Sequence, residues 1–135
     1  MSLARVFKAF RRAGTPTPPE TPAARRAPAF KNITPADAAA RLSTFRIVDV
    51  REAAEFGSRE LGHLAASVNV PLSRVGQASA QWAAEAPILL VCRSGRRSGL
   101  AADGLARQGF LHVHNLAGGL IAWHRSQLPV AGRKA

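Results

Sequence analysis

The sequence contains a single cysteine, Cys92, among its 135 residues. A lone cysteine cannot form a disulfide within the chain, so nothing indicates a secreted scaffold held together by disulfides. Long apolar runs are also lacking: none approaches the roughly 20 residues that cross a bilayer, and the N-terminus has no apolar stretch typical of a signal peptide. We therefore expect a cytoplasmic protein that uses a free thiol. Import into an organelle is the alternative, because the N-terminal segment is rich in arginine and nearly free of acidic residues.

Acidic residues are scarce, with 8 Asp and Glu against 19 Lys and Arg and a formal net charge of +11. Such an excess favours a nucleic-acid partner at first sight. However, residues 1–31 hold seven Lys or Arg and one acidic residue, Glu20, which accounts for +6 of the +11 and leaves +5 for the rest. Three of the remaining positive charges, Arg93, Arg96 and Arg97, lie beside Cys92. We therefore expect a small anionic ligand and no nucleic-acid partner.

Residues 1–29 form a basic, proline-rich tail ahead of a domain that we place at 30–135. Leu3, Val6, Phe7 and Phe10 recur at helical spacing, with basic residues on the opposite face, which predicts a short cationic amphipathic helix that ends at Gly14. The prolines that follow predict an extended linker. Because so small an apolar face buries little surface, a frayed tail is the simpler interpretation. Contact with an anionic membrane surface is the functional alternative.

The domain alternates short apolar runs with segments that favour helices. Thr34 followed by Pro35 is typical of a helix N-terminus, and the run at 87–91 is the most apolar in the chain, as expected for a strand buried on both faces. The predicted strands are 46–50, 67–70, 87–91 and 112–116. The predicted helices are 35–42, 98–108 and 120–127, and the segment 72–85 is mostly compatible with a helix. This alternation predicts an α/β fold with three layers: a doubly wound, mostly parallel sheet with helices on both faces.

The segment Cys92-Arg-Ser-Gly-Arg-Arg-Ser98 lies between the strongest predicted strand and a helix. Ligands of such folds bind beyond the carboxyl ends of the strands, which is where this segment falls. Gly95 allows the backbone to curl so that amide N–H groups converge, and the helix that follows adds its positive end. Adjacent cations and helix N-termini lower the pKa of a cysteine thiol from about 8.5. We predict an anion-binding loop around a Cys92 thiolate.

No histidine base can be inferred for this thiol, because the sequence places none of the four histidines, His63, His112, His114 and His124, beside Cys92. We also expect no cofactor and no bound metal. A small buried apolar residue at the end of a strand is the structural alternative for a free cysteine. Three arginines within the next five residues favour the functional interpretation, because their charges require solvent or an anion.

Four motifs in this order resemble the rhodanese homology family, and the resemblance extends from about Ile33 to Val130. They are Asp49-Val-Arg-Glu52 followed by Glu55-Phe56, Gly62-His63 through Asn69-Val-Pro-Leu72, the Cys92–Ser98 segment, and Leu116-Ala-Gly-Gly-Leu-Ile-Ala-Trp123. The resemblance is not complete. Ala65 and Ala66 stand where the family often has proline and glycine, and Arg96 stands where a small or polar residue is common.

The resemblance implies a sulfurtransferase that carries sulfur as a persulfide on Cys92. Thiosulfate or a similar small anionic donor would supply the sulfur, and cyanide, a small thiol or a protein thiol would accept it. The loop from Arg93 through Ser94 and Gly95 to Ser98 would bind the persulfide and donor through its amides. Its arginines, Arg93, Arg96 and Arg97, would hold the donor's sulfonate. Asp49 and Arg51 match supporting positions that pair with other charges and order the loops.

Two other functions remain open at this point. A cysteine-loop phosphatase also uses a thiolate in an anion-binding loop, but the arginine of those enzymes falls one place later, where this chain has Ser98. A binding or regulatory module without catalysis is the other alternative. Such members of the family often lose the cysteine that this chain retains.

Overall fold

In the computed structural model, the described residues are 30–133. The predicted cationic helix and proline-rich linker in residues 1–29 lie outside them. The described strands and helices follow the order β1 (Phe30–Ile33), α2 (Pro35–Ala40), β2 (Arg46–Asp49), α3 (Ala53–Phe56), β3 (Val68–Asn69), α4 (Val75–Ala78), β4 (Ile88–Val91), α5 (Arg96–Arg107), β5 (Val113–Leu116) and α6 (Gly119–Arg125). Three single 3-10 turns occur at Leu42–Thr44, Leu72–Arg74 and Ser79–Gln81.

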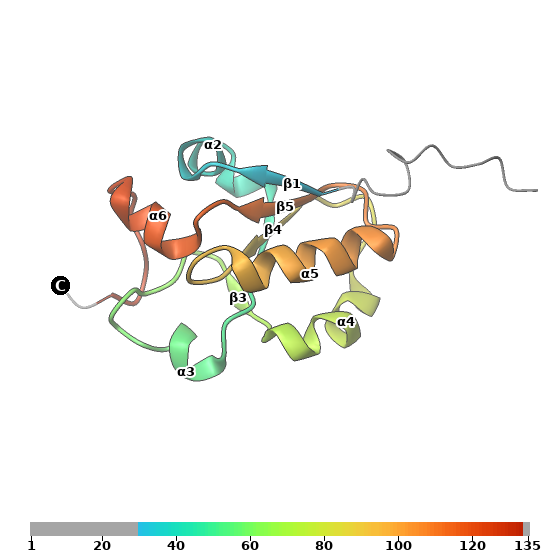
Figure 1. The fold of residues 1–135 in the computed structure, drawn as a ribbon, viewed down its shortest axis with the longest axis horizontal. Coiled ribbons are helices and arrows are strands. Elements are labelled where there is room, and N and C mark those ends of the chain that lie inside the picture. Colours follow the sequence, from blue (N-terminus) through green and yellow to red (C-terminus); the bar gives the residue numbers. More distant parts are fainter. Residues whose placement is uncertain (1–29, 134–135) are drawn as a thin grey trace, which may run out of the picture.

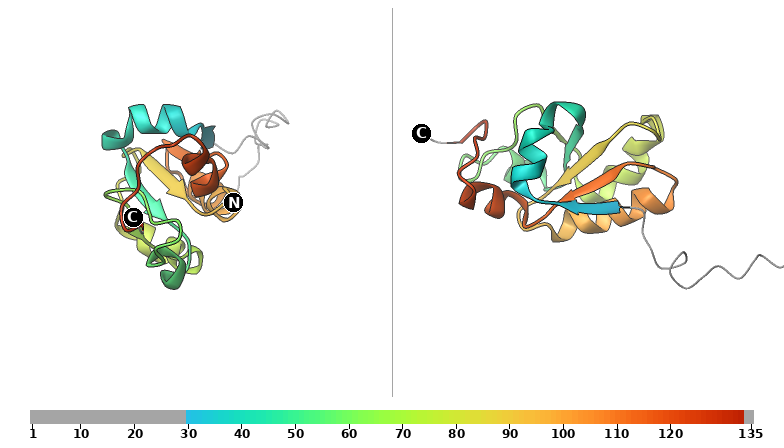
Figure 2. Two further views of the ribbon diagram at one scale, coloured as in Figure 1. Left: turned by 90° about the vertical axis from the view of Figure 1, so that its left-hand side faces the viewer. Right: turned by 90° about the horizontal axis from the view of Figure 1, so that it is seen from above.

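The strands form one five-stranded sheet in the order β1-β5-β4-β2-β3, and every pairing is parallel. Helices α4 and α5 lie on one side of this sheet and α2 and α6 on the other (Figures 1 and 2). The predicted three-layer α/β architecture is therefore confirmed. Among residues 30–133, no helix is both long enough and apolar enough to cross a membrane.

The central strand β4 explains the three layers. All four of its residues are buried, and successive side chains of a strand point to opposite faces. Ile88 and Leu90 belong to the core on the α5 side, whereas Leu89 and Val91 belong to the core on the α6 side. The same alternation directs the next residue, Cys92, toward the α5 side, where it is part of that core.

The helix-compatible segment 72–85 does not form one continuous helix. The chain instead makes a 3-10 turn, the four-residue helix α4 and a second 3-10 turn, and becomes extended at Trp82. The Ser79 hydroxyl donates to the carbonyl of Gly76 at 3.1 Å, a local bond that competes with helix propagation. Extension at Trp82 lets its ring pack edge-on against Phe110, with ring centroids 6.5 Å apart.

Two elements were not predicted at all. The sequence does not predict strand β1, because Lys31 and Asn32 are both polar and the segment shows no alternation of apolar and polar residues. Both residues are exposed in the structure. Helix α3 is a single turn, too short to show helical periodicity. The predicted N-terminus of α2 is confirmed, because the amide of Asp37 donates to the side chain of Thr34 at 3.1 Å.

Candidate active site

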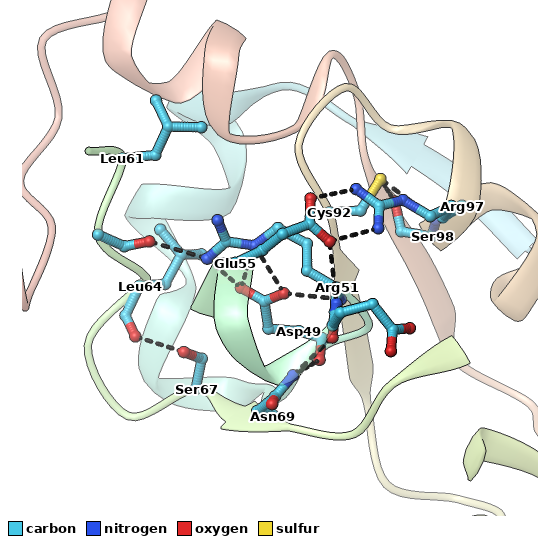
Figure 3. Close-up of polar contacts among 12 residues, drawn as sticks. Asp49, Arg51, Glu55, Leu61, Leu64, Ser67, Asn69, Cys92, Arg97 and Ser98 are labelled. Atoms are coloured by element: carbon cyan, nitrogen blue, oxygen red, sulfur yellow. Dashed lines mark hydrogen bonds and ion pairs between the residues drawn. The ribbon is translucent and has the colours of Figure 1, made fainter. Parts of the chain in front are cut away.

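The loop after β4 wraps around the sulfur of Cys92. Gly95 has a φ of +94°, in the left-handed region that favours glycine, and the chain turns there into α5. This turn brings the amide of Gly95 to 3.1 Å from the Sγ atom of Cys92 and the amide of Ser98 to 3.4 Å. The predicted helix start was Ser98, but α5 begins at Arg96, so the Ser98 amide belongs to the first turn, where N–H groups lack helical partners. The loop thus surrounds the sulfur with hydrogen-bond donors, and Figure 3 shows Ser98 beside the Cys92 sulfur.

Two opposing effects act on the Cys92 thiol. The residue is 1% exposed, and this burial, the largest effect, raises the pKa of the thiol. Hydrogen bonds from the Ser98 side chain and from the backbones of Ser98, Gly95 and Ser94 lower the pKa and outweigh the burial, so the pKa lies below its ordinary value. The predicted direction holds. The leading cause differs, because the largest lowering effects are hydrogen bonds within the loop and not the neighbouring arginines.

Ser98 connects the sulfur to Asn115, a residue that the sequence analysis did not single out. The Ser98 hydroxyl lies 3.2 Å from the Cys92 sulfur and 2.6 Å from the Oδ1 atom of Asn115. Because a hydroxyl has one proton, it donates to only one of these at a time. Asn115 also donates to the carbonyl of Gly95 at 3.1 Å and to Asn32 at 2.9 Å, which holds the loop against the sheet. Its signal in the sequence is weak, because the predicted strand 112–116 also contains two other polar residues, His112 and His114.

The N-terminus of α6 supports the other side of the loop. The amide of Leu120 donates to the carbonyl of Cys92 at 2.9 Å, and that of Ile121 donates to the carbonyl of Arg93 at 3.0 Å. Gly119 permits this approach: it has a φ of +61°, and a Cβ atom there would lie 2.5 Å from the Arg93 oxygen. This contact explains why the Gly118-Gly119 motif follows β5.

The three loop arginines occupy different surroundings. Arg93 and Arg96 are exposed. Arg97 is half-buried, and its two terminal nitrogens donate to the two carboxylate oxygens of Glu55 at 2.7 and 2.9 Å (Figure 3). This bidentate pair, 42 residues apart in sequence, holds the pKa of Glu55 at about 2. The sequence motif contained Glu55 but offered no reason to join it to Arg97.

Asp49 and Arg51 form a buried ion pair behind the loop. Asp49 is fully buried and Arg51 is 2% exposed. The Arg51 Nε atom donates to both Asp49 oxygens at 3.0 and 3.2 Å, and its Nη2 atom donates to Oδ2 at 2.9 Å. Arg51 also donates to the carbonyl of Gly62 at 2.8 Å. Removing one partner would leave a buried charge uncompensated, so the pair ties the end of β2 to the Gly62 turn.

A small cavity of about 80 Å³ lies beside the loop, lined by Arg51, Glu55, Ser58, Glu60, Leu61 and Arg93. A larger one of about 620 Å³, lined by residues such as Lys31, Arg41 and His112, lies near the amino ends of β4 and β5, away from the sulfur. No group of three or more His, Cys, Asp or Glu side chains within residues 30–133 is arranged to hold a metal ion.

Replacing Ser98 with alanine tests the hydrogen bond to the sulfur. We expect the pKa of Cys92 to rise and alkylation at neutral pH to slow roughly tenfold, the size of one charge-assisted hydrogen bond. The measurement is the rate of iodoacetamide alkylation across pH. Ser94→Ala is the matched control, because it removes an exposed hydroxyl and keeps the backbone N–H. A Ser98→Ala profile that superimposes on the wild type would show that the hydroxyl does not stabilise the thiolate.

Comparison with known proteins identifies the family to which this chain belongs. A family model, the Rhodanese-like domain, matches residues 34–126, and the chain belongs to this family. A crystal structure of a rhodanese-related protein from Thermoplasma volcanium matches with a TM-score of 0.68 and 26% identity, covering 76% of this chain and 99% of that one.

Two curated relatives match this chain over more than two thirds of their own length. The uncharacterised protein YqhL of Bacillus subtilis is 34% identical over 94 residues, which are 70% of this chain and 72% of that protein. A protein named thiosulfate sulfurtransferase GlpE, from Vibrio cholerae, is 33% identical over 84 residues, 62% of this chain and 76% of that protein. The chain spans only about half the length of several other relatives, between 42% and 52%.

Proposed function

We propose that this protein is a sulfurtransferase that moves a sulfane sulfur from a small anionic donor, such as thiosulfate, to a thiol or cyanide through a persulfide on Cys92. The observation that carries the proposal is the convergence of the Gly95 and Ser98 amides on the Cys92 sulfur at 3.1 and 3.4 Å. These groups can only donate hydrogen bonds, so they stabilise an anion at this position. The relative named thiosulfate sulfurtransferase adds support from similarity.

The reaction has two displacements. The Cys92 thiolate attacks the outer sulfur of thiosulfate, a bond forms between the two sulfurs, and the sulfur–sulfur bond of the donor breaks with its electron pair leaving on sulfite. In the second step, a thiolate or cyanide attacks the terminal sulfur of the persulfide. The bond to Cys92 breaks, its electron pair returns to the Cys92 sulfur, and the thiolate is restored. No cofactor is required for either displacement.

The loop's other residues have supporting roles in this proposal. Its amides hold the negative charge on Cys92 in the resting enzyme and on the persulfide after loading. The exposed side chains of Arg93 and Arg96 attract the anionic donor. The buried pair of Asp49 and Arg51 fixes the neighbouring turn. We place the reaction in the cytoplasm, because reducing compartments maintain the free thiol on which it depends.

The position of Ser98 favours sulfur transfer over phosphate hydrolysis. A cysteine-loop phosphatase would have its arginine at this place, but here a serine amide and hydroxyl face the sulfur. The loop therefore closes tightly around one sulfur atom and offers no guanidinium at the position where a phosphoryl group would need it. Appreciable hydrolysis of an aryl phosphate, without sulfur transfer from thiosulfate, would reverse this assignment.

The direct experiment is intact-protein mass spectrometry after treatment with thiosulfate. We expect a gain of one sulfur atom, about 32 Da, that is lost again on addition of cyanide or a thiol. Labelling with a thiol reagent in parallel shows that Cys92 is accessible and reduced. If Cys92 takes the label but no sulfur is gained from thiosulfate or from a persulfide donor, the chain is better described as a binding module.

A further inference from the structure

We propose that Glu55 sets the charge class of the sulfur donor, so that the site prefers donors with one negative charge over dianionic thiosulfate. The inference rests on the proposed sulfurtransferase function and specifies its substrate class. The ion pair with Glu55 removes Arg97 from the set of unpaired cations around the sulfur. Arg97 follows Cys92 by five residues and is one of the three loop arginines to which the family resemblance assigns the donor's sulfonate.

The Glu55 carboxylate is fixed from two sides. Both of its oxygens accept from Arg97, and the Oε1 atom also accepts from the amide of Glu52 at 3.0 Å, within the capping box that begins α3. Bidentate pairs with arginine are strong and directional. The carboxylate therefore occupies the position where a donor's sulfonate would form the same pair with Arg97, and a donor must compete with a built-in anion.

The charges that line the small cavity beside the loop, to which the exposed Arg96 does not belong, leave little attraction for a second negative charge. The small cavity next to Arg93 is lined by two arginines, Arg51 and Arg93, and two glutamates, Glu55 and Glu60, whose formal charges cancel. Outside the cavity lining, Arg51 pairs with Asp49 and Glu55 pairs with Arg97. The formal charges of Asp49 and Arg97 also cancel each other. A dianion placed here is attracted less strongly than it would be near an unpaired Arg97. Because electrostatic attraction scales with charge, the same cancellation weakens the attraction of a monoanion by half as much.

The donor class that fits is a sulfane sulfur with one negative charge, as in an organic thiosulfonate or a hydropersulfide. For methanethiosulfonate, the Cys92 thiolate would take the outer sulfur and methanesulfinate would leave with the electron pair. This anion has the geometry of thiosulfate with a methyl group in place of one oxygen. It therefore serves as the probe that differs from thiosulfate mainly in charge.

The test compares kcat/KM for thiosulfate and methanethiosulfonate in wild type and in Glu55→Gln. Glutamine keeps an oxygen for the capping box and removes the charge. We expect the ratio of thiosulfate to methanethiosulfonate to rise by about five- to tenfold, the effect of one unit charge a few ångströms away in a water-like medium. Comparing ratios removes the different intrinsic reactivities of the two donors.

Asp103→Asn is the matched control. It breaks another carboxylate–arginine ion pair, a single-contact surface pair between Asp103 and Arg107 on α5, at a distance of 2.8 Å. Arg107 lies ten residues beyond Arg97 on the same helix, about 15 Å along its axis. This variant should leave the donor ratio unchanged. Glu55→Ala, which removes the charge without the capping oxygen, should raise the ratio in the same direction as Glu55→Gln.

The outcomes separate this inference from the proposed function. If both donors load Cys92 and the ratio stays constant or falls in Glu55→Gln, Glu55 serves to orient Arg97 for the donor and the charge-class inference is wrong. An equal rise in Asp103→Asn would also overturn it, because the effect would then be general. If neither donor transfers sulfur to the wild-type protein, the sulfurtransferase function itself fails, and this inference fails with it.

Discussion

Replacing Cys92 with serine should abolish sulfur transfer, with activity falling at least about a thousandfold to the uncatalysed background. The hydroxyl of serine occupies nearly the same space and meets the same donors, the amides of Gly95 and Ser98. Its proton is held far more tightly than that of a thiol, so the same hydrogen bonds cannot ionise it at neutral pH. It also cannot form a persulfide. The loss is therefore chemical and not structural.

The measurement pairs steady-state sulfur transfer with near-ultraviolet circular dichroism. The dichroism should match that of the wild type, because Trp123 and the rest of the buried core keep their packing around a side chain of similar size. Sulfur transfer at the wild-type rate in the folded Cys92→Ser protein would show that Cys92 is not the nucleophile. Cys92 is the only cysteine in the chain, so no other thiol could replace it.

Gly119→Ala should be the most destabilising of the glycine substitutions near the loop. The added Cβ would lie 2.5 Å from the Arg93 oxygen and 2.6 Å from that of Cys92, and the φ of +61° is unfavourable for alanine. Because these oxygens belong to the backbone, the clash can be relieved only if the loop and α6 move apart. We expect a loss of about 3 kcal/mol in the free energy of unfolding, together with slower alkylation of Cys92.

Gly104→Ala is the matched control for this prediction. Gly104 lies within α5, and a Cβ atom there would meet no atom within 4 Å. Alanine should therefore stabilise the protein by up to about 1 kcal/mol, through its higher helix propensity. Urea denaturation of both variants measures the difference. Equal stability of Gly119→Ala and wild type would mean that Gly119 does not pack closely against the carbonyl groups of Cys92 and Arg93.

The sequence predicted the features that depend on local pattern. The apolar run of β4 identified a strand buried on both faces, and its end placed Cys92 at the carboxyl edge of the sheet. Gly95, three residues after Cys92, predicted a curled loop, and its left-handed backbone conformation confirms this. These predictions succeed because strand burial and backbone curvature are encoded in residues close together in the chain.

Contacts between distant residues could not be predicted in the same way. Glu55 meets Arg97 across 42 residues, and Asn115 reaches both Ser98 and Gly95 from another strand. The sequence therefore suggested three cations around the sulfur, whereas the fold gives one of them a carboxylate partner. The balance between burial and hydrogen bonding at Cys92 likewise depends on side-chain packing that only the structure contains.

The central claim is that the loop's hydrogen bonds keep the Cys92 sulfur ionised despite its burial, and a pH titration of the thiolate's ultraviolet absorbance tests it most directly. Cys92 is the only cysteine in the chain, and Glu55, with a pKa of about 2, stays charged throughout the thiol range, so its pair with Arg97 is intact during the titration. We predict a single transition below the value of about 8.5 typical of an unperturbed cysteine. A transition at or above that value would show that burial prevails over the amides, and would contradict the account.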